Sequence, residues 1–330
     1  MRLLDYLSSQ DLVPRIAAHL RASHDSHPLS EERQQNLLQV AHAHLHPHCA
    51  DPQACLAISP EQPFRLGLLR LLLEATQDPD LALPCLLEEG VPTGSFCPLP
   101  SSQQWPQASA AASADALDLD LVHCDQNWLA AEQDPECVER LVQEEVAQGF
   151  VEPVHGTLAD AQRAWPLGTA VGKLNLVKAP GKEPRLVLDS TISSLNPRCH
   201  VPEHVALPSA SEVRRCFLPE DSRHAWEGLS LDFKAAHKCV KVRPADRGTL
   251  LFRVRNQLYF YKVCHFGGRF SAYHWQRVGA ALLQVSRAVL AHLPHRAWLT
   301  SMTCSPPCAA ALAQNSVPCS WPCSLSCTRR

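Results

Sequence analysis

The chain has 330 residues, of which 45% are hydrophobic and 19% are charged. This composition supplies a packed core and excludes a wholly disordered protein. Lys and Arg number 30 against 33 Asp and Glu, a formal net charge of -3. The chain as a whole therefore has no excess positive charge to attract nucleic acid, and any such binding needs a local basic surface.

Targeting signals are not evident in the sequence. Residues 1–15 lack the unbroken apolar stretch of a signal peptide. The most apolar run, Leu66 to Leu73, contains Arg70 and is too short to span a bilayer. We therefore expect an intracellular protein of the nucleus or cytoplasm, with most of its 15 cysteines as free thiols.

The amino-terminal region, residues 1–98, is predicted to be mostly helical and has no recognisable role. Ser30 followed by two glutamates is typical of a helix start, and the helix should run to about Leu45. A second helix is predicted over Phe64 to Ala75, where leucines surround the axis almost completely. Residues 42–49 alternate histidine with other residues and end in Cys49. They could hold a metal ion if extended, although a polar helix end stopped by Pro47 is the favoured interpretation.

Residues 99–125 read as a low-complexity linker rich in Ser, Ala, Gln and Pro. A helix is predicted directly after it, because Asp134 suits the N-cap, Pro135 the first turn and Gly149 the stop. Within this helix, valines and Leu141 recur on one face.

From residue 170 the pattern changes to strands interleaved with helices, which indicates an α+β fold class. The predicted elements are two hairpins (173–178 with 185–189, and 250–255 with 258–263), a strand over 228–233 and a long helix over 271–292.

Four groups of residues stand in a fixed order in this part of the chain. They are Lys178 with Arg185–Asp189 and Leu195–Pro197; Leu231–His237 with Val240–Val242 and Asp246; the aromatic Tyr259–Tyr261; and Cys264–Gly267 with Ser271–Ala272. In this order and spacing they resemble the reverse transcriptase family of retroviruses and retrotransposons, over about residues 126–299. The resemblance implies fingers and a partial palm, and RNA-directed DNA polymerase activity as a nucleotidyltransferase of a mobile element. The implied partners are an RNA or DNA primer-template and a dNTP.

The resemblance assigns roles to individual residues. Asp232 ends an apolar strand and is implied to be a catalytic carboxylate that binds Mg²⁺ in a two-metal site. Taken alone, an aspartate in this position would be a strand-end or turn residue. Lys178 and Arg185 are implied to contact the phosphates of the nucleotide, since a guanidinium binds phosphate oxygens in pairs. The alternative for both is a solvated hairpin surface.

Three further residues are implied to contact the nucleotide. His237 falls where the family places a bulky side chain beneath the sugar, although many relatives have an aromatic residue there. Phe266 and Gly267 match the loop that packs on the incoming nucleotide. The preceding residue is His265, where relatives often have proline.

The family's next landmark, Tyr-x-Asp-Asp, is missing. It is expected directly after Leu299, but the chain continues Thr-Ser-Met-Thr-Cys, and residues 300–330 contain no Asp or Glu. The codons TAC GTC GAT GAC CTG C encode Tyr-Val-Asp-Asp-Leu, and reading them from the second base gives Thr-Ser-Met-Thr-Cys. We therefore expect a frame change after Leu299, a truncated palm and an out-of-frame, disordered tail over 300–330. With its metal site incomplete, the chain is expected to be catalytically inactive.

Two other functions stay open. One is noncatalytic nucleic-acid binding through the basic hairpin residues Lys173, Lys178, Lys182 and Arg185. The other is a zinc-dependent interaction protein, built on residues 42–49 or on the tail cysteines at 304, 308, 319, 323 and 327. Frame disruption is favoured over a zinc module because prolines and serines fill the gaps between these cysteines and no histidine accompanies them.

Overall fold

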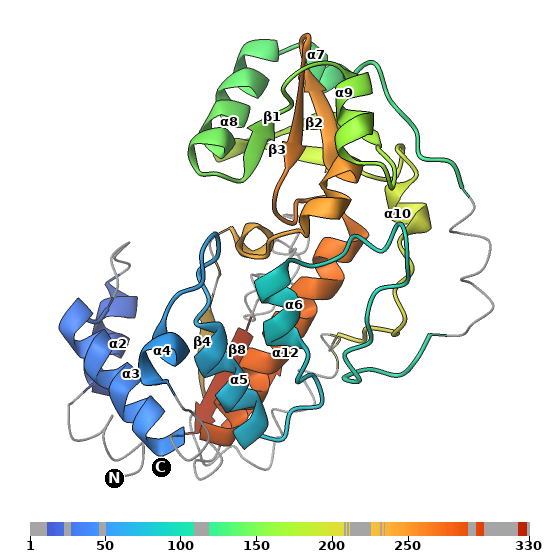
Figure 1. The fold of residues 1–330 in the computed structure, drawn as a ribbon. Coiled ribbons are helices and arrows are strands. Elements are labelled where there is room, and N and C mark those ends of the chain that lie inside the picture. The colour runs from blue at the N-terminus through green and yellow to red at the C-terminus, as the bar shows by residue number, and fades with distance from the viewer. Residues whose placement is uncertain are drawn as a thin grey trace.

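The structure is a computed structural model that describes residues 12–22, 28–45, 51–108, 119–207, 209, 211, 226–231, 233, 235–289, 295–299 and 323–328. It contains a mixed five-stranded sheet with helices around it (Figure 1). The mixture of helices and strands expected from the sequence is therefore confirmed. Asp232 and most of the tail lie outside the described residues.

The helices are α2 (Leu12–Arg21), α3 (Glu31–Leu45), α4 (Pro52–Leu56), α5 (Leu66–Ala75), α6 (Leu83–Glu89), α7 (Leu129–Glu132), α8 (Pro135–Ala147), α9 (Leu158–Ala164), α10 (Leu195–Arg198) and α12 (Arg269–Val289), with 3-10 helices η4 (Ala236–Cys239) and η5 (Pro244–Leu250). The strands are β1 (Val151–Pro153), β2 (Val171–Ala179), β3 (Lys182–Asp189), β4 (Trp226–Leu231), β5 (Leu251–Val254), β6 (Gln257–Tyr261), β7 (His295–Leu299) and β8 (Cys323–Thr328).

The main sheet has the strand order β1-β6-β5-β2-β3. Only the β2–β5 pair is parallel, and the other pairs are antiparallel. Both predicted hairpins, β2–β3 and β5–β6, are confirmed. Alternate residues of β2 and β3 are buried, with Leu174 opposite Leu188 and Leu176 opposite Leu186. This alternation leaves Arg185 on the outer face of the hairpin.

A second sheet has the order β4-β8-β7, with antiparallel pairs. It includes the strand predicted over 228–233, which β4 forms over Trp226–Leu231. It also includes β8, from the carboxyl-terminal tail. The disorder and frame change expected for residues 300–330 stay predictions, since most of those residues are outside the described ranges.

Helix α8 begins and ends where its sequence signals predict. The Asp134 carboxylate accepts a hydrogen bond from the N–H of Cys137 at 3.1 Å, and Pro135 fills the first helical position. At the other end Gly149 adopts φ 75°, and its N–H donates to Val146 O at 2.9 Å. The predicted apolar face is buried through Val138 and Val142.

Helix α12 is the long helix predicted over 271–292, and it forms the centre of the core. Its buried residues include Phe270, Trp275 and Val278. Figure 1 shows α12 descending from the sheet toward α5, which it contacts.

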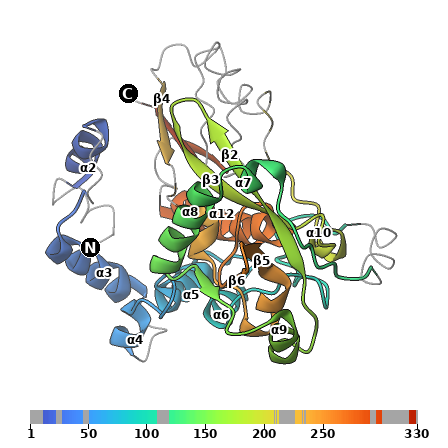
Figure 2. The same cartoon turned by 90° about the horizontal axis from the view of Figure 1, so that it is seen from above.

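One hydrophobic core runs through the described parts of regions 1–98 and 126–299. Leu66, Leu73 and Leu83 belong to the same buried cluster as Leu174 of the hairpin and Trp275 of α12. The domain divisions at 98 and 125 stay predictions, but apolar burial continues across them. Figures 1 and 2 show α2, α3 and α4 to one side of the rest.

Two buried polar networks connect the early residues to α12. Arg277 donates from Nε and Nη2 to the two oxygens of Asp80, both at 2.7 Å, and both side chains are almost wholly buried. Glu203 accepts from Ser101 Oγ, Ser102 Oγ and Tyr273 OH, each at 2.7 Å. Burial alone would raise the pKa of Glu203, but these hydrogen bonds outweigh it and lower the pKa.

The amino-terminal helix predictions are confirmed by α3 and α5. Ser30 Oγ accepts from Arg33 N–H at 3.4 Å, as its capping position implies. The histidine-rich stretch is divided, because α3 ends at Leu45 and residues 46–50 lie outside the described part. In the residues that the structure describes, no group of three or more His, Cys, Asp or Glu side chains could hold a metal ion. No helix in the same residues is long and apolar enough to cross a membrane.

Candidate functional site

The candidate site is built around the β2–β3 hairpin. Lys178 is exposed near its tip, but its ammonium group lies 2.5 Å from Asp134 Oδ2. The hydrogen bond from Lys178 is the main cause of the lowered pKa of Asp134, and the hydrogen bond from Cys137 N–H lowers it further. The hydrogen bond with Asp134 in turn raises the pKa of Lys178. One of the two predicted phosphate-binding cations is therefore already paired with the N-cap of α8.

Arg185 differs from Lys178 in having a free guanidinium. It is exposed on β3, where its Cα pairs with that of Val177. In the described part of the chain it forms no ion pair or hydrogen bond with another side chain. Because all of its side-chain donors remain available, Arg185 is the better placed of the two residues to bind a phosphate.

The loop that contains Phe266 and Gly267 rests directly on β3. Gly267 has φ 102°, and a Cβ added there would lie only 2.1 Å from the carbonyl oxygen of Leu188 and 3.4 Å from Val187 Cγ1. Only glycine fits this close approach. Arg185 and Val187 share one face of β3 and are about 7 Å apart along the strand. The loop and the free guanidinium are therefore neighbours.

Asn196 fastens this loop in place. Its Nδ2 donates to Gly267 O at 2.7 Å and to Thr191 Oγ1 at 3.0 Å, while its Oδ1 accepts from Arg269 N–H at 2.7 Å. One side chain thus holds the loop, the start of α12 and the segment after β3. We call this arrangement the Asn196 clamp. Asn196 belongs to the first of the four sequence groups and Gly267 to the fourth. The sequence did not predict that these two groups are in contact.

His237 lies beside the same loop but in the interior. It belongs to η4, is 3% exposed, and meets the Phe266 ring edge-on with ring centroids 5.3 Å apart. Burial lowers its pKa to about 4, partly offset by a hydrogen bond with the backbone of Ser271. The imidazole is therefore neutral at pH 7. The structure brings His237 and Phe266 together, and the buried imidazole packs against the half-buried Phe266 ring.

His265 is a residue of this site whose role sequence reasoning missed. Its ring stacks on Tyr261 at 5.1 Å. Its Nδ1 lies 2.9 Å from Phe266 O, and its Nε2 lies 3.3 Å from Ser190 Oγ. Since a carbonyl only accepts, Nδ1 carries the proton and Nε2 accepts from Ser190. The only sequence signal was that His265 stands where relatives often have proline. In the structure its two ring nitrogens join the loop to the end of β3.

The metal-binding part of the prediction rests on Asp232, which lies outside the described residues. Its neighbour Phe233 packs edge-on against Trp275, with ring centroids 5.5 Å apart, so this segment adjoins α12. The resemblance assigns this one carboxylate, and in the described residues no cluster of three or more His, Cys, Asp or Glu side chains could hold a metal ion. A single carboxylate does not satisfy two magnesium ions, and no catalytic step through metal follows from this donor set.

The sequence matches no model of a known protein family and no curated protein. The case for its function therefore rests on its own residues and their geometry.

Proposed function

We propose that the chain is the fingers and partial palm of a retroelement reverse transcriptase. In this proposal it keeps surfaces for a nucleotide and a primer-template and lacks the full set of carboxylates for two-metal nucleotidyl transfer. Its partners are an RNA or DNA primer-template and a dNTP. The chain as it stands binds these partners and does not extend a primer.

The observation that carries the proposal is the Asn196 clamp. It holds the Phe266–Gly267 loop against β3, the strand that bears Arg185. A free guanidinium and a half-buried aromatic ring then lie on neighbouring elements. The guanidinium can bind a phosphate, and the aromatic ring can pack against the flat face of a base or against the sugar.

Binding of a fluorescent primer-template, followed by anisotropy, tests the proposal. The parent chain should bind, and the affinity should fall steeply between about 50 and about 200 mM salt because binding releases counterions. Arg185→Ala should weaken binding severalfold. Arg140→Ala is the matched control, since Arg140 is also exposed but already paired with Glu144 in α8. A chain that binds no primer-template at low salt, or binds it equally after Arg185→Ala, contradicts the proposal.

A primer-extension assay with Mg²⁺ and dNTPs tests the catalytic half. No extension is expected, because the second catalytic motif is absent from the sequence. Extension by the purified parent chain above the level of an Asp232→Asn variant would overturn this part.

Noncatalytic nucleic-acid binding is the second candidate function, and the hairpin surface favours it. Lys182 is exposed, and Lys173 lies over the Trp128 ring at 5.1 Å, which places a cation beside an exposed aromatic side chain. The two candidates differ in their response to dNTP. The correct dNTP should tighten primer-template binding under the first proposal and leave it unchanged under the second.

A further inference from the structure

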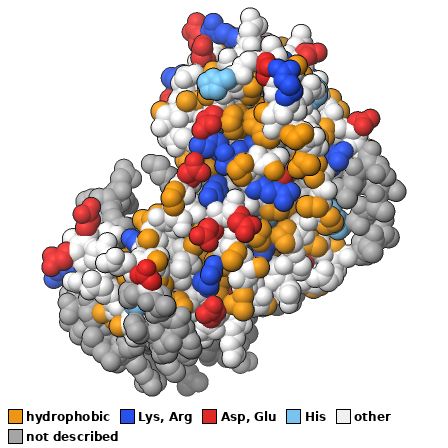
Figure 3. Space-filling view, viewed as in Figure 1, with side chains coloured by type: hydrophobic (Ala, Val, Ile, Leu, Met, Phe, Trp, Pro, Cys, Tyr) orange, Lys and Arg blue, Asp and Glu red, His pale blue; other side chains and the backbone are white. Residues whose placement is uncertain are grey.

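A separate cavity of about 600 Å³ lies away from the hairpin. Its walls come from the loop before α5, the end of α8, η4, η5 and the end of β6. Figure 3 shows Lys and Arg side chains gathered with acidic ones across the waist between the upper sheet and the lower helices. None of the residues assigned to nucleotide contact lines this cavity, which we call the basic pocket.

Positive charge lines the basic pocket beyond what nearby carboxylates neutralise. Its four cations are Lys238, Lys241, Arg247 and Lys262. Lys238 pairs with Glu145, and Lys262 pairs with Glu152 at 2.7 Å.

The other two cations have no carboxylate within ion-pair distance in the described part of the chain. These are Lys241 and Arg247. Arg247 Nε donates to Val242 O at 3.0 Å, which leaves its terminal nitrogens for another acceptor. Burial lowers the pKa of Arg247, although Glu61 and Glu152 act in the opposite direction. A half-buried guanidinium with open donors is a site for an anion.

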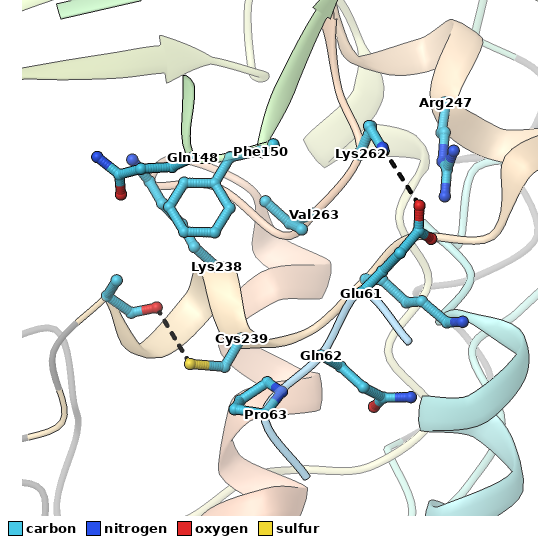
Figure 4. A pocket seen from close by; sticks show the side chains of 13 residues that line it. Glu61, Gln62, Pro63, Gln148, Phe150, Lys238, Cys239, Arg247, Lys262 and Val263 are labelled. Atoms are coloured by element: carbon cyan, nitrogen blue, oxygen red, sulfur yellow. Dashed lines mark hydrogen bonds and ion pairs between the residues drawn. The ribbon is translucent and has the colours of Figure 1, made fainter. Parts of the chain in front are cut away.

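Glu61 now occupies the basic end of the pocket. Its carboxylate points to Lys262 at 3.3 Å, and Arg247 lies beside it (Figure 4). The backbone of Glu61 has φ 62°, a left-handed conformation that glutamate rarely adopts. Its side chain is 52% exposed, so it can leave the pocket without a rearrangement of the core.

Apolar side chains line the end of the pocket away from Arg247, together with Gln148 and Lys238. Phe150, Pro63 and Val263 line it, and Figure 4 shows the Phe150 ring beside Val263 at the end away from Arg247. Lys238 Nζ lies over the Phe150 ring at 5.3 Å. A cavity of this size with paired and unpaired cations at one end and an aromatic ring at the other matches a small amphipathic ligand.

We propose that the basic pocket binds a small organic phosphate with an aromatic or aliphatic body. The phosphate takes the place of the Glu61 carboxylate against Arg247 and Lys262, and the body lies on Phe150 and Val263. Phosphate fits better than carboxylate because its two negative charges and three terminal oxygens can engage the Arg247 guanidinium and the Lys262 ammonium together. This site is independent of the proposed polymerase surface.

Calorimetric titration of the full chain with phenyl phosphate tests the proposal. Phenyl phosphate should bind at least about fivefold more tightly than inorganic phosphate, since only it has a body for the apolar end. It should also bind more tightly than benzoate, which has the ring and a single charge. Equal affinity for the three probes, or no binding of phenyl phosphate at millimolar concentration, overturns the proposal.

Substitutions locate the binding site. Glu61→Gln should tighten phenyl phosphate severalfold by removing the competing carboxylate, whereas Glu139→Gln, a matched exposed glutamate paired with Arg255 elsewhere, should leave it unchanged. Arg247→Met should weaken binding about tenfold through the loss of a charge-assisted hydrogen bond. If Arg247→Met does not fold, Lys241→Met gives the same test with the other cation that has no carboxylate within ion-pair distance in the described residues. Unchanged affinity in both Glu61→Gln and the folded cation variant places the ligand elsewhere and refutes the assignment.

Discussion

Gly267 has no room for even one side-chain atom. Its φ is 102° and the carbonyl oxygen of Leu188 occupies the space of a Cβ. Gly181, at the tip of the β2–β3 hairpin, has a similar φ of 69° but nothing within 4 Å of its added Cβ. The two positions therefore separate the cost of the backbone conformation from the cost of the collision.

Gly181→Ala should lower the free energy of unfolding by about 1 kcal/mol, the cost of an alanine in the left-handed region. Gly267→Ala should lower it by about 3 kcal/mol or more, because backbone must also move. Urea unfolding of both variants measures the difference. Similar losses in the two would mean that the loop does not lie this close to β3.

The buried histidines predict how stability depends on pH. The pKa values of His237 and His265 are lowered to about 4 and that of His274 to about 3, in each case first by burial. In the unfolded chain a histidine has a pKa near 6.5, so as the pH falls below that value the unfolded state takes up protons before the folded state does. Stability should therefore be full above about pH 7 and fall toward pH 4, by up to about 1.4 kcal/mol per pH unit for each ring.

Urea midpoints at pH 7 and pH 5 measure this loss. His265→Phe keeps a ring to stack on Tyr261 but cannot take a proton, so it should lose less stability between the two pH values than the parent. An equal loss in both would assign the pH dependence to other groups.

At the scale of elements, α8 and the β2–β3 hairpin are joined by one carboxylate with two tasks. Asp134 caps α8 and also holds the Lys178 ammonium. The ion pair is exposed and contributes little to stability, whereas the cap satisfies a helix N–H that would otherwise lack a partner. The pair therefore matters mainly for the charge that the hairpin presents.

Asp134→Ser should separate these two tasks. Serine keeps an N-cap oxygen but releases Lys178 and removes a negative charge from the hairpin. We expect little change in the thermal melting temperature and tighter primer-template binding, with a steeper salt dependence, in an anisotropy titration. The double variant Asp134→Ser/Lys178→Ala should lose the gain, and a gain that persists there would show that Lys178 is not its source.

At the scale of the whole molecule, the buried Asp80–Arg277 pair and the shared hydrophobic cluster join the segment around α5 and α6 to α12, so we expect these parts to unfold together. Asp80→Asn leaves a buried guanidinium without its counter-charge, which costs about 3–5 kcal/mol. The double variant Asp80→Leu/Arg277→Met removes both charges and should recover much of that loss. Calorimetry should show a single transition in the parent chain, and two separate transitions would contradict the continuous core.

Local elements were predictable from the sequence, whereas their long-range contacts were not. Caps such as Asp134 and alternation such as that of β2 and β3 are encoded within a few residues, so these elements were predicted closely. The Asn196 clamp joins residues 71 positions apart, and no local pattern signals it. The composition of residues 99–108 likewise gave no sign that Glu203, about 100 residues later, would bind Ser101 and Ser102. Lys178 and Arg185 were assigned to the same phosphate-contacting hairpin from the sequence, and the fold distinguished the paired cation from the free one.

The Asp80–Arg277 pair also sets an order of events on the ribosome. The two residues are 197 positions apart in the chain. At synthesis rates of about 5–20 residues per second, Asp80 and the leucines around it wait about 10–40 s for their partner to be made. During that interval the emerging amino-terminal helices display apolar surface that α12 will later cover. Folding of the early segment is therefore delayed until Arg277 has been made, and a nascent chain that stops before Arg277 exposes apolar surface to chaperones and proteases.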